Sequence, residues 1–168
     1  MEEQTLVIFL SDNGGATYTN TTNNGPLRGG KITDFEGGIR VPFFMRWPNK
    51  IQAGNNYKKA VMGMDIFTTI AGITETPLPA NRHIDGKDLL SYIKDDSLVP
   101  HEQLFWQRGN SRAVRSGNMK VIWNQEFLDT LIYDLSADPF EQQEKPAGIR
   151  ATELIRLHQD WSETLPAP

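Results

Sequence analysis

The stretch Thr5-Leu6-Val7-Ile8-Phe9-Leu10-Ser11-Asp12-Asn13-Gly14-Gly15 decides how the first half of the chain is interpreted. Residues 5–10 form a continuous apolar run that contains β-branched side chains and is too short for a typical buried helix. Such a run predicts a strand buried on both faces, as in a parallel sheet. The polar residues after it predict a loop at the carboxyl end of the strand, where open α/β sheets bind ligands.

Polar groups in and after this loop are candidates for a binding site. The carboxylate of Asp12 and the amide oxygen of Asn13 suit a hard cation such as Ca²⁺ or Mg²⁺, and Gly14-Gly15 let the backbone approach a ligand. Taken alone, the same residues fit an ordinary Asx-type turn better. Lys31, which follows two glycines, can present an ammonium group to an oxyanion, although a lone loop lysine is usually a solvated surface charge.

The rest of the first hundred residues contains few elements. Residues 16–30 are polar and predict a long surface loop, and residues 39–45 predict a second buried strand. Asp65 is a good N-cap for a short helix over residues 66–71 that Gly72 ends. Parallel strands need crossover connections and neighbours. Two buried strands therefore indicate that a partner covers them or that the chain is part of something larger.

The pattern changes after about residue 100, where four short apolar segments predict strands separated by tight turns. These segments are residues 104–106, 113–115, 119–123 and 130–133. Ser116-Gly117-Asn118 is a hairpin turn. A final helix has Leu154, His158, Trp161 and Leu165 on one face. We therefore expect two regions, residues 1–100 and residues 101–168, the second being a small antiparallel sheet packed by the last helix.

Composition excludes several classes of protein. The chain has 168 residues, a net charge of −4 and no cysteine. The mild acidity argues against nucleic-acid binding, and no apolar run approaches the roughly 18 residues of a membrane span. The lack of cysteine excludes disulfides, thiolate metal sites and cysteine nucleophiles, but leaves the compartment open. Residues 1–4 have no basic segment, so we expect no signal peptide.

The order and spacing of several motifs resemble the type I sulfatase family of the alkaline phosphatase-like superfamily. The motifs are S-D-N-G-G (11–15), N-G-P-L-R-G-G-K (24–31), E-G-G-I-R-V-P (36–42), R-W-P (46–48), V-M-G-M-D-I-F-T-T-I-A-G (61–72), I-D-G-K-D-L-L (84–90), and R…K and Y-D-L…D-P-F-E signatures within residues 112–120 and 133–141. The resemblance maps onto the last third or so of a family member.

This resemblance implies a fold class. It is α/β, here as an α+β fragment from the C-terminal part of an alkaline phosphatase-like fold. Incomplete parallel-sheet elements are expected first, followed by a small antiparallel sheet with a C-terminal helix. By the same resemblance, residues 1–100 form the C-terminal end of the catalytic α/β domain, and residues 101–168 form a C-terminal subdomain.

The resemblance also assigns roles to residues. Asp12 and Asn13 correspond to two of the family's Ca²⁺ ligands, and Lys31 corresponds to a lysine that contacts the substrate's sulfate. A divalent cation and an ammonium group together stabilise the charge that develops during sulfate-ester hydrolysis. Structural roles are implied for four other charged residues, Glu36, Arg40, Asp65 and Asp85.

The family's nucleophile has no counterpart in this chain. It is a formylglycine made from Cys or Ser in a C/S-x-P-x-R motif, and no serine here has that context. Two oxygen ligands also fall short of the roughly six to eight that Ca²⁺ takes. We therefore expect the chain alone to bind calcium weakly or not at all and to be inactive. His83 and His101 match no family motif, and a lone loop histidine is usually solvated.

Three functions stay open. The favoured one is a C-terminal fragment of a calcium-dependent sulfatase, because the lysine-bearing motif favours sulfate. The alternatives are a phosphate-ester hydrolase of the same superfamily and a non-catalytic binding module derived from a sulfatase. The expected partners are a sulfate-ester substrate in the intact enzyme and either an upstream sulfatase fragment or a second copy. Nucleic acid and membranes are not expected partners. A sulfated glycan, a steroid and a small aryl ester are all possible substrates.

Overall fold

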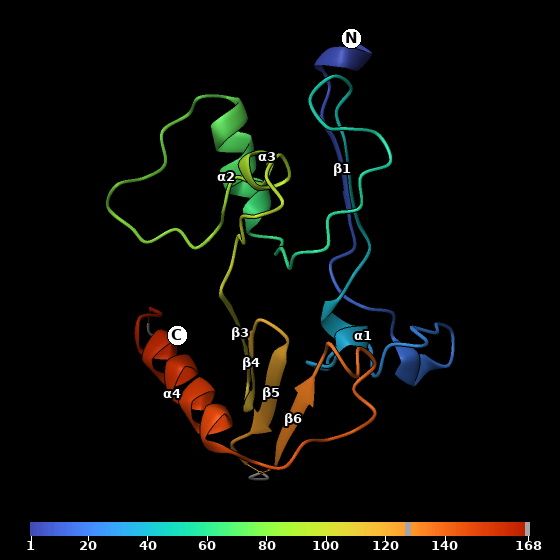
Figure 1. Cartoon of the computed structure of the whole chain (residues 1–168), viewed down its shortest axis with the longest axis vertical. Helices are drawn as coiled ribbons and strands as arrows, with labels where there is room; N and C mark the ends of the chain where they lie inside the picture. The colour runs from blue at the N-terminus through green and yellow to red at the C-terminus, as the bar shows by residue number, and fades with distance from the viewer. Residues whose placement is uncertain (127–128, 167–168) are drawn as a thin grey trace. The chain divides into compact units, whose positions relative to one another are not determined.

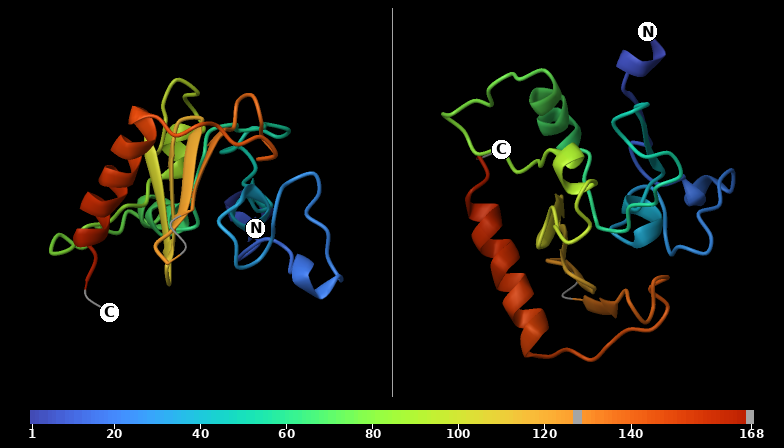
Figure 2. Two further views of the ribbon diagram at one scale, coloured as in Figure 1. Left: turned by 90° about the horizontal axis from the view of Figure 1, so that it is seen from below. Right: turned by 45° about the horizontal axis from the view of Figure 1, so that its top comes forward.

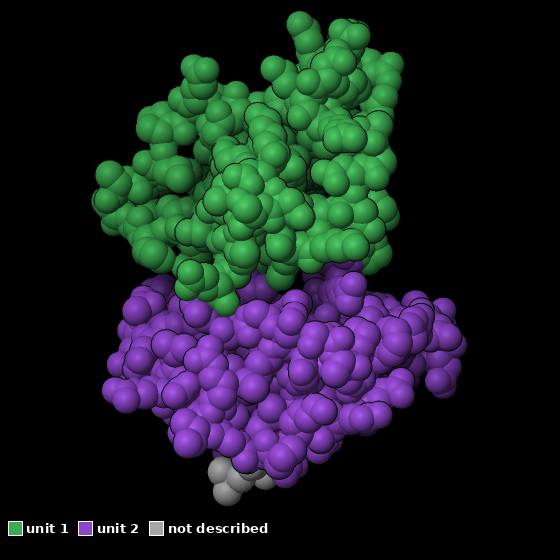
Figure 3. All heavy atoms as spheres, in the orientation of Figure 1, with its two compact units in different colours: residues 1–10, 42–102 green, residues 11–41, 103–168 purple. Residues whose placement is uncertain are grey.

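The computed structural model describes residues 1–126 and 129–166 (Figure 1). Its contacts divide the chain into two compact units (Figure 3). Unit 1 contains residues 1–10 and 42–102, and unit 2 contains residues 11–41 together with the chain from residue 103 onward. Residues 11–41, which the sequence grouped with the first region, belong to unit 2.

Unit 1 combines a two-stranded sheet with short helices. Its elements are the 3₁₀ helix η1 (Glu2–Gln4), β1 (Val7–Leu10), β2 (Phe43–Arg46), α2 (Asp65–Ile73) and α3 (Leu89–Tyr92). β1 and β2 pair antiparallel, with Phe9 opposite Phe44. The expected parallel arrangement is therefore wrong. The second strand also begins later than residue 39, because Glu36–Ile39 forms the helical turn α1.

The β1–β2 sheet is open to solvent, which corrects the prediction that both strands are buried. Val7, Phe9 and Phe44 lie on one face and are 51%, 58% and 65% exposed. An apolar run indicates that a strand prefers to be buried. It does not indicate whether the surface that covers the strand belongs to the same chain. A two-stranded sheet of this kind is only marginally stable by itself in water.

Helix α2 is longer than predicted. It begins at Asp65 and continues through Gly72 to Ile73, and the N-cap residue is Met64. The prediction that Asp65 is the N-cap is therefore wrong, because its carboxylate binds outside the helix.

Asp65 is fully buried and joins three segments of unit 1. It accepts hydrogen bonds from the backbone N–H of Met62 at 2.7 Å and of Lys87 at 2.8 Å. The Nε2 of His101 donates to the same carboxylate at 2.9 Å, and the His101 side chain is only 6% exposed. Its role is thus structural, as expected, and His101 is a packed residue rather than a solvated loop histidine.

Unit 2 is built around an antiparallel sheet. Its elements are the 3₁₀ helix η2 (Thr17–Thr19), α1 (Glu36–Ile39), β3 (Gln103–Arg108), β4 (Ser111–Ser116), β5 (Met119–Asn124), β6 (Thr130–Asp134) and α4 (Ile149–Glu163). The strand order is β3-β4-β5-β6, and each neighbouring pair is antiparallel. The predicted small antiparallel sheet with a C-terminal helix is confirmed.

This sheet is covered on both faces, as Figure 2 shows. Helix α4 packs against one face, where alternate strand residues such as Val114 and Val121 meet Leu154. The other face carries Ala113, Ile122 and Tyr133, and Phe35 from the segment before α1 packs against it. Residues 11–41 join unit 2 because part of this segment supplies the second apolar cover.

The apolar stripe of α4 faces the sheet over most of its length. Leu154 and His158 are buried, and Trp161 stacks on Phe105 with ring centroids 5.0 Å apart. Leu165 is the exception, because α4 ends at Glu163 and Leu165 is 38% exposed. The predicted stripe is therefore right for three residues and wrong for Leu165. Among the residues described, no helix has the length and apolar character needed to cross a membrane.

We expect His158 to make the stability of unit 2 depend on pH. Its Nε2 donates to the backbone oxygen of Trp106 at 3.0 Å, and burial lowers the pKa of the ring below its usual value. The unfolded chain therefore binds a proton more readily, and stability is lost as the pH falls through about 6.5. We expect the urea midpoint to drop between pH 7.5 and pH 5.5, and to drop less in His158→Gln. An equal drop in both proteins would contradict this assignment.

Candidate functional site

The loop that follows β1 is held by backbone contacts to α1. The hydroxyl of Ser11 donates to the backbone oxygen of Asn13 at 2.8 Å. The backbone N–H of Gly14 donates to the oxygen of Gly38 at 2.9 Å. A Cβ atom on Gly14 would lie 1.7 Å from the backbone oxygen of Gly37, so only glycine allows this approach. The two glycine-containing motifs are therefore parts of one structure.

Residues 16–30 form an ordered loop that Asn24 closes. Its side chain accepts from the N–H of Gly15 at 2.9 Å and donates to the oxygen atoms of Gly15 and Gly29 at 3.0 and 3.1 Å. Directly after this loop, the N–H of Lys31 donates to the oxygen of Gly15 at 3.0 Å. The backbone of Lys31 is thereby fixed next to the loop that contains the other two predicted site residues.

The three predicted site residues present accessible polar groups. Asp12 and Lys31 are exposed and Asn13 is half-buried. Within residues 1–126 and 129–166, none of these side chains takes part in a hydrogen bond or an ion pair, and no three His, Cys, Asp or Glu side chains gather as a metal site. The oxygen donors of Asp12 and Asn13 suit calcium in kind, but a full coordination shell needs further ligands from outside this chain.

A buried ionic cluster lies beside this loop region, and it consists of Glu36, Lys120 and Glu141. The Nζ of Lys120 donates to Glu36 Oε1 at 2.9 Å and lies 2.7 Å from Glu141 Oε1. Glu141 Oε2 accepts from the backbone N–H of Glu36 at 2.6 Å. All three residues are at most 2% exposed. Burial raises the pKa of Glu141, and the nearby Lys120 ammonium opposes that rise.

Arg28 connects this cluster to the sheet. Its Nη1 donates to the backbone oxygen of Glu141 at 2.9 Å and to the hydroxyl of Tyr133 at 2.8 Å. Its guanidinium also lies over the ring of Phe35, 4.3 Å from the centroid. Burial raises the pKa of Tyr133 to about 12, so its hydroxyl stays protonated at neutral pH.

The sequence motifs include Glu36, Lys120 and Glu141, but they do not show that these residues contact one another. The nearest cation in the sequence, Arg40, does pair with Glu36, but only at 4.0 Å between Arg40 Nη1 and Glu36 Oε2, and its side chain is mostly exposed. The available signal was a lysine within the apolar strand over residues 119–123, since a buried lysine needs an acidic partner. That partner lies far away in the sequence.

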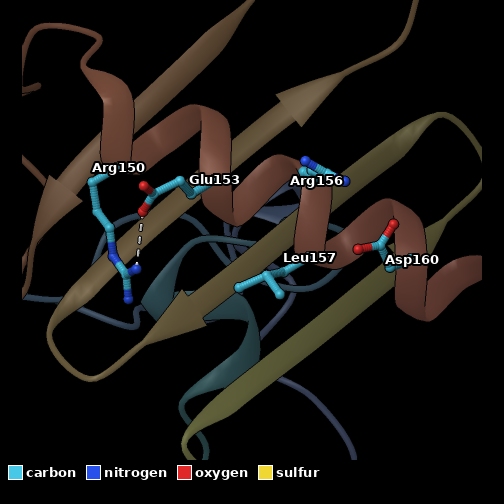
Figure 4. Close-up of a pocket in the computed structure, with 5 residues that line it drawn as sticks. All are labelled: Arg150, Glu153, Arg156, Leu157 and Asp160. Atoms are coloured by element: carbon cyan, nitrogen blue, oxygen red, sulfur yellow. Dashed lines mark hydrogen bonds and ion pairs between the residues drawn. The ribbon is translucent and has the colours of Figure 1, made fainter.

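Two other polar features involve none of these residues. His83 Nε2 is 2.8 Å from Asp85 Oδ1, and this pair is exposed in unit 1. Figure 4 shows an open groove along α4, lined by Leu157 and by charged residues that include Arg150 and Glu153, which form an ion pair at 3.1 Å. The groove contains no converging set of buried polar groups.

Comparisons with known proteins identify the family. The sulfatase family model matches residues 1–76. Human steryl-sulfatase (Homo sapiens) is 40% identical over 139 residues, which cover 76% of this chain and 24% of that protein. The chain belongs to the sulfatase family. N-acetylgalactosamine-6-sulfatase of Canis lupus familiaris is 38% identical over 125 residues, covering 72% of this chain and 24% of that protein.

The fold agrees with this assignment. The crystal structure of Ps i-CgsB superposes with a TM-score of 0.85 at 26% identity, over 96% of this chain and 37% of that chain. The chain spans about a quarter of the length of the two curated relatives named above. The resemblance drawn from the motifs is confirmed, and so is the mixed α/β fold class with a small antiparallel sheet and a C-terminal helix.

Proposed function

We propose that this chain is part of a calcium-dependent sulfatase that hydrolyses sulfate esters. In this proposal Asp12 and Asn13 supply two calcium ligands, and Lys31 binds the sulfate group. The observation that supports it is the hydrogen bond from Lys31 N–H to Gly15 oxygen, which joins the carriers of these groups. A cation and an ammonium that bind the same small oxyanion must lie close together, so the segments that contain the calcium ligands and Lys31 have to be neighbours.

The chemistry of the proposed site is electrostatic. When bound, calcium supplies Lewis-acid stabilisation of the sulfate oxygens. Lys31 has an exposed ammonium that can bind a sulfate oxygen and stabilise the charge that develops as the ester bond breaks. Asp12 and Asn13 would hold the cation through their side-chain oxygens. The formylglycine nucleophile and the remaining metal ligands belong to the rest of the proposed enzyme, so this chain alone is inactive.

The substrate in this proposal is defined by its sulfate group. The names of two relatives state different alcohol portions, a sterol and N-acetylgalactosamine. Lys31, Asp12 and Asn13 would contact the group that such substrates share. A phosphate ester presents a similar oxyanion, and a phosphate-ester hydrolase of the same superfamily is therefore the competing activity.

We further propose that the rest of the sulfatase covers the exposed β1–β2 sheet. The relatives contain about three quarters of their length beyond the matched part. Val7, Phe9 and Phe44 give the sheet an exposed apolar face, and apolar faces and unpaired strand edges recruit covering segments. The occupant is thus an upstream sulfatase segment rather than a second copy of this chain.

Co-expression tests both parts of the proposal. The chain would be produced alone and with an upstream sulfatase fragment that carries the C/S-x-P-x-R motif, and both samples would be assayed on 4-nitrophenyl sulfate and 4-nitrophenyl phosphate with and without Ca²⁺. Calcium-dependent sulfate release only in the complex is the expected result. Preferential phosphate release would favour the competing hydrolase. A stable complex with neither activity would favour a non-catalytic module, and a self-associated chain that ignores the fragment would refute the proposed cover.

A further inference from the structure

Stability alone does not explain why the buried cluster of Glu36, Lys120 and Glu141 is ionic. Its members come from α1, from β5 and from the segment after β6. Apolar residues of similar volume often replace a buried ion pair without loss of stability. An ionic network differs because each charge must lie within hydrogen-bond distance of its partners, and this fixes the position of every segment that contributes to it.

One path of contacts runs from the cluster to the loop after β1. Glu36 begins α1, and the next residue, Gly37, donates its N–H to the oxygen of Arg28 at 2.7 Å. The oxygen of Gly38 accepts from Gly14 N–H at 2.9 Å. The loop that contains Asp12 is therefore two residues and one hydrogen bond away from the buried carboxylate.

The backbone segments along this path pack very closely. A Cβ atom on Gly37 would lie 2.4 Å from the oxygen of Arg28, and one on Gly38 would lie 2.2 Å from the oxygen of Thr33. Backbone atoms packed this closely move together, because neither side can shift without losing its hydrogen bond or overlapping its neighbour. A displacement of Glu36 is thus transmitted to the segment that contains Arg28 and to the loop that contains Gly14.

A second path reaches Lys31 from the other side. Arg28 lies three residues before Lys31 and donates to the backbone oxygen of Glu141 at 2.9 Å. Glu36 lies five residues after Lys31 and donates its N–H to the Glu141 carboxylate at 2.6 Å. Both ends of the segment 28–36 are therefore tied to the same residue, Glu141, and Lys120 in turn holds the Glu141 carboxylate at 2.7 Å.

We propose that Lys120 and Glu141 are positioning residues that hold the segment 28–36, and with it Lys31, against the loop that contains Asp12 and Asn13. They act on the site through the backbone and touch neither metal nor substrate. The identity of the group that Lys31 binds depends on the proposed sulfatase function. The position of Lys31 depends on this cluster, so an experiment can refute the positioning role without refuting the function, and the reverse.

Amide hydrogen exchange on the chain itself tests this role. We expect Glu141→Gln to speed exchange at Gly14, Gly37 and Lys31 by at least about tenfold, while amides paired within β3, β4 and β5 change little. Glutamine keeps the size of the side chain and an acceptor for Glu36 N–H, so the variant should fold. Lys120→Met should change the same amides more strongly.

The matched control is Ile132→Val, a mild change on the sheet face that packs against α4. It should alter exchange in the sheet and in α4 but leave the three loop amides unchanged. An equal increase at all amides in Glu141→Gln, or unchanged exchange at Gly14 and Lys31, would overturn the positioning role. Loss of loop protection in a protein whose complex never hydrolyses sulfate would refute the proposed function instead.

Discussion

Replacing Lys120 with methionine is expected to lower the unfolding free energy of unit 2 by about 3–5 kcal/mol at pH 7, as measured by urea denaturation. The ammonium of Lys120 is fully buried between two carboxylates, 2.9 Å from Glu36 and 2.7 Å from Glu141. Methionine fills a similar volume, so the loss reports the two carboxylates left without a cation rather than a cavity. A domain of this size has a total stability of roughly 5–15 kcal/mol, so the variant is close to unfolding.

The double variant Lys120→Met/Glu141→Gln is the control for this prediction, because it removes one of the two stranded carboxylates. It should lose less stability than Lys120→Met alone. The deficit should also depend on pH. Burial already raises the pKa of Glu141, and loss of Lys120 removes an opposing influence. A carboxyl with a raised pKa in the folded state costs stability as the pH rises, so the deficit should shrink in acid. A loss below about 1 kcal/mol, the value of an exposed ion pair, would show that the cluster is not desolvated in solution.

The sheet of unit 2 could be predicted from sequence because its signals are local. Each strand is a short apolar segment, and the turn at Ser116-Gly117-Asn118 is followed by β5, with Gly117 at a φ of +57°. Strands joined by such turns pair with their chain neighbours. The stripe on α4 was visible for the same reason, since its residues recur at helical spacing. Leu165 failed because it lies beyond the end of the helix, and spacing alone does not fix a helix terminus.

Features that depend on distant partners could not be predicted in the same way. The apolar run in β1 has the same sequence whether its neighbour runs parallel or antiparallel, and the actual neighbour is β2, more than thirty residues later. Glu36 and Lys120 are 84 residues apart, and Glu36 and Glu141 are 105 residues apart. No local pattern pairs such residues. The family motifs marked them as important, but only the structure shows that they contact one another.

Replacing Lys31 with alanine, in the complex formed with the upstream fragment, is expected to lower kcat for 4-nitrophenyl sulfate by about 10²–10³-fold, which is the usual effect of removing one oxyanion-stabilising donor. The ammonium of Lys31 is exposed and has no ion-pair partner within the residues described. Its loss should therefore change the unfolding free energy by less than about 0.5 kcal/mol. A large kinetic effect with an unchanged melting temperature would separate substrate binding from folding. The companion variant Asp12→Ala should instead weaken calcium binding, measured by titration of the complex.

Lys94→Ala is the matched control, because Lys94 is also exposed and its removal changes the net charge by the same amount. If attraction of an anionic substrate by overall charge explained the effect, both variants would slow the reaction alike and salt would reduce the difference. Direct contact with the sulfate predicts that only Lys31→Ala slows the reaction and that Lys31→Arg restores part of the rate, since arginine keeps the charge with a different donor geometry. Full activity in Lys31→Ala would exclude Lys31 from the sulfate site. The calcium affinity of the same variant would then show whether Asp12 and Asn13 still bind the cation without it.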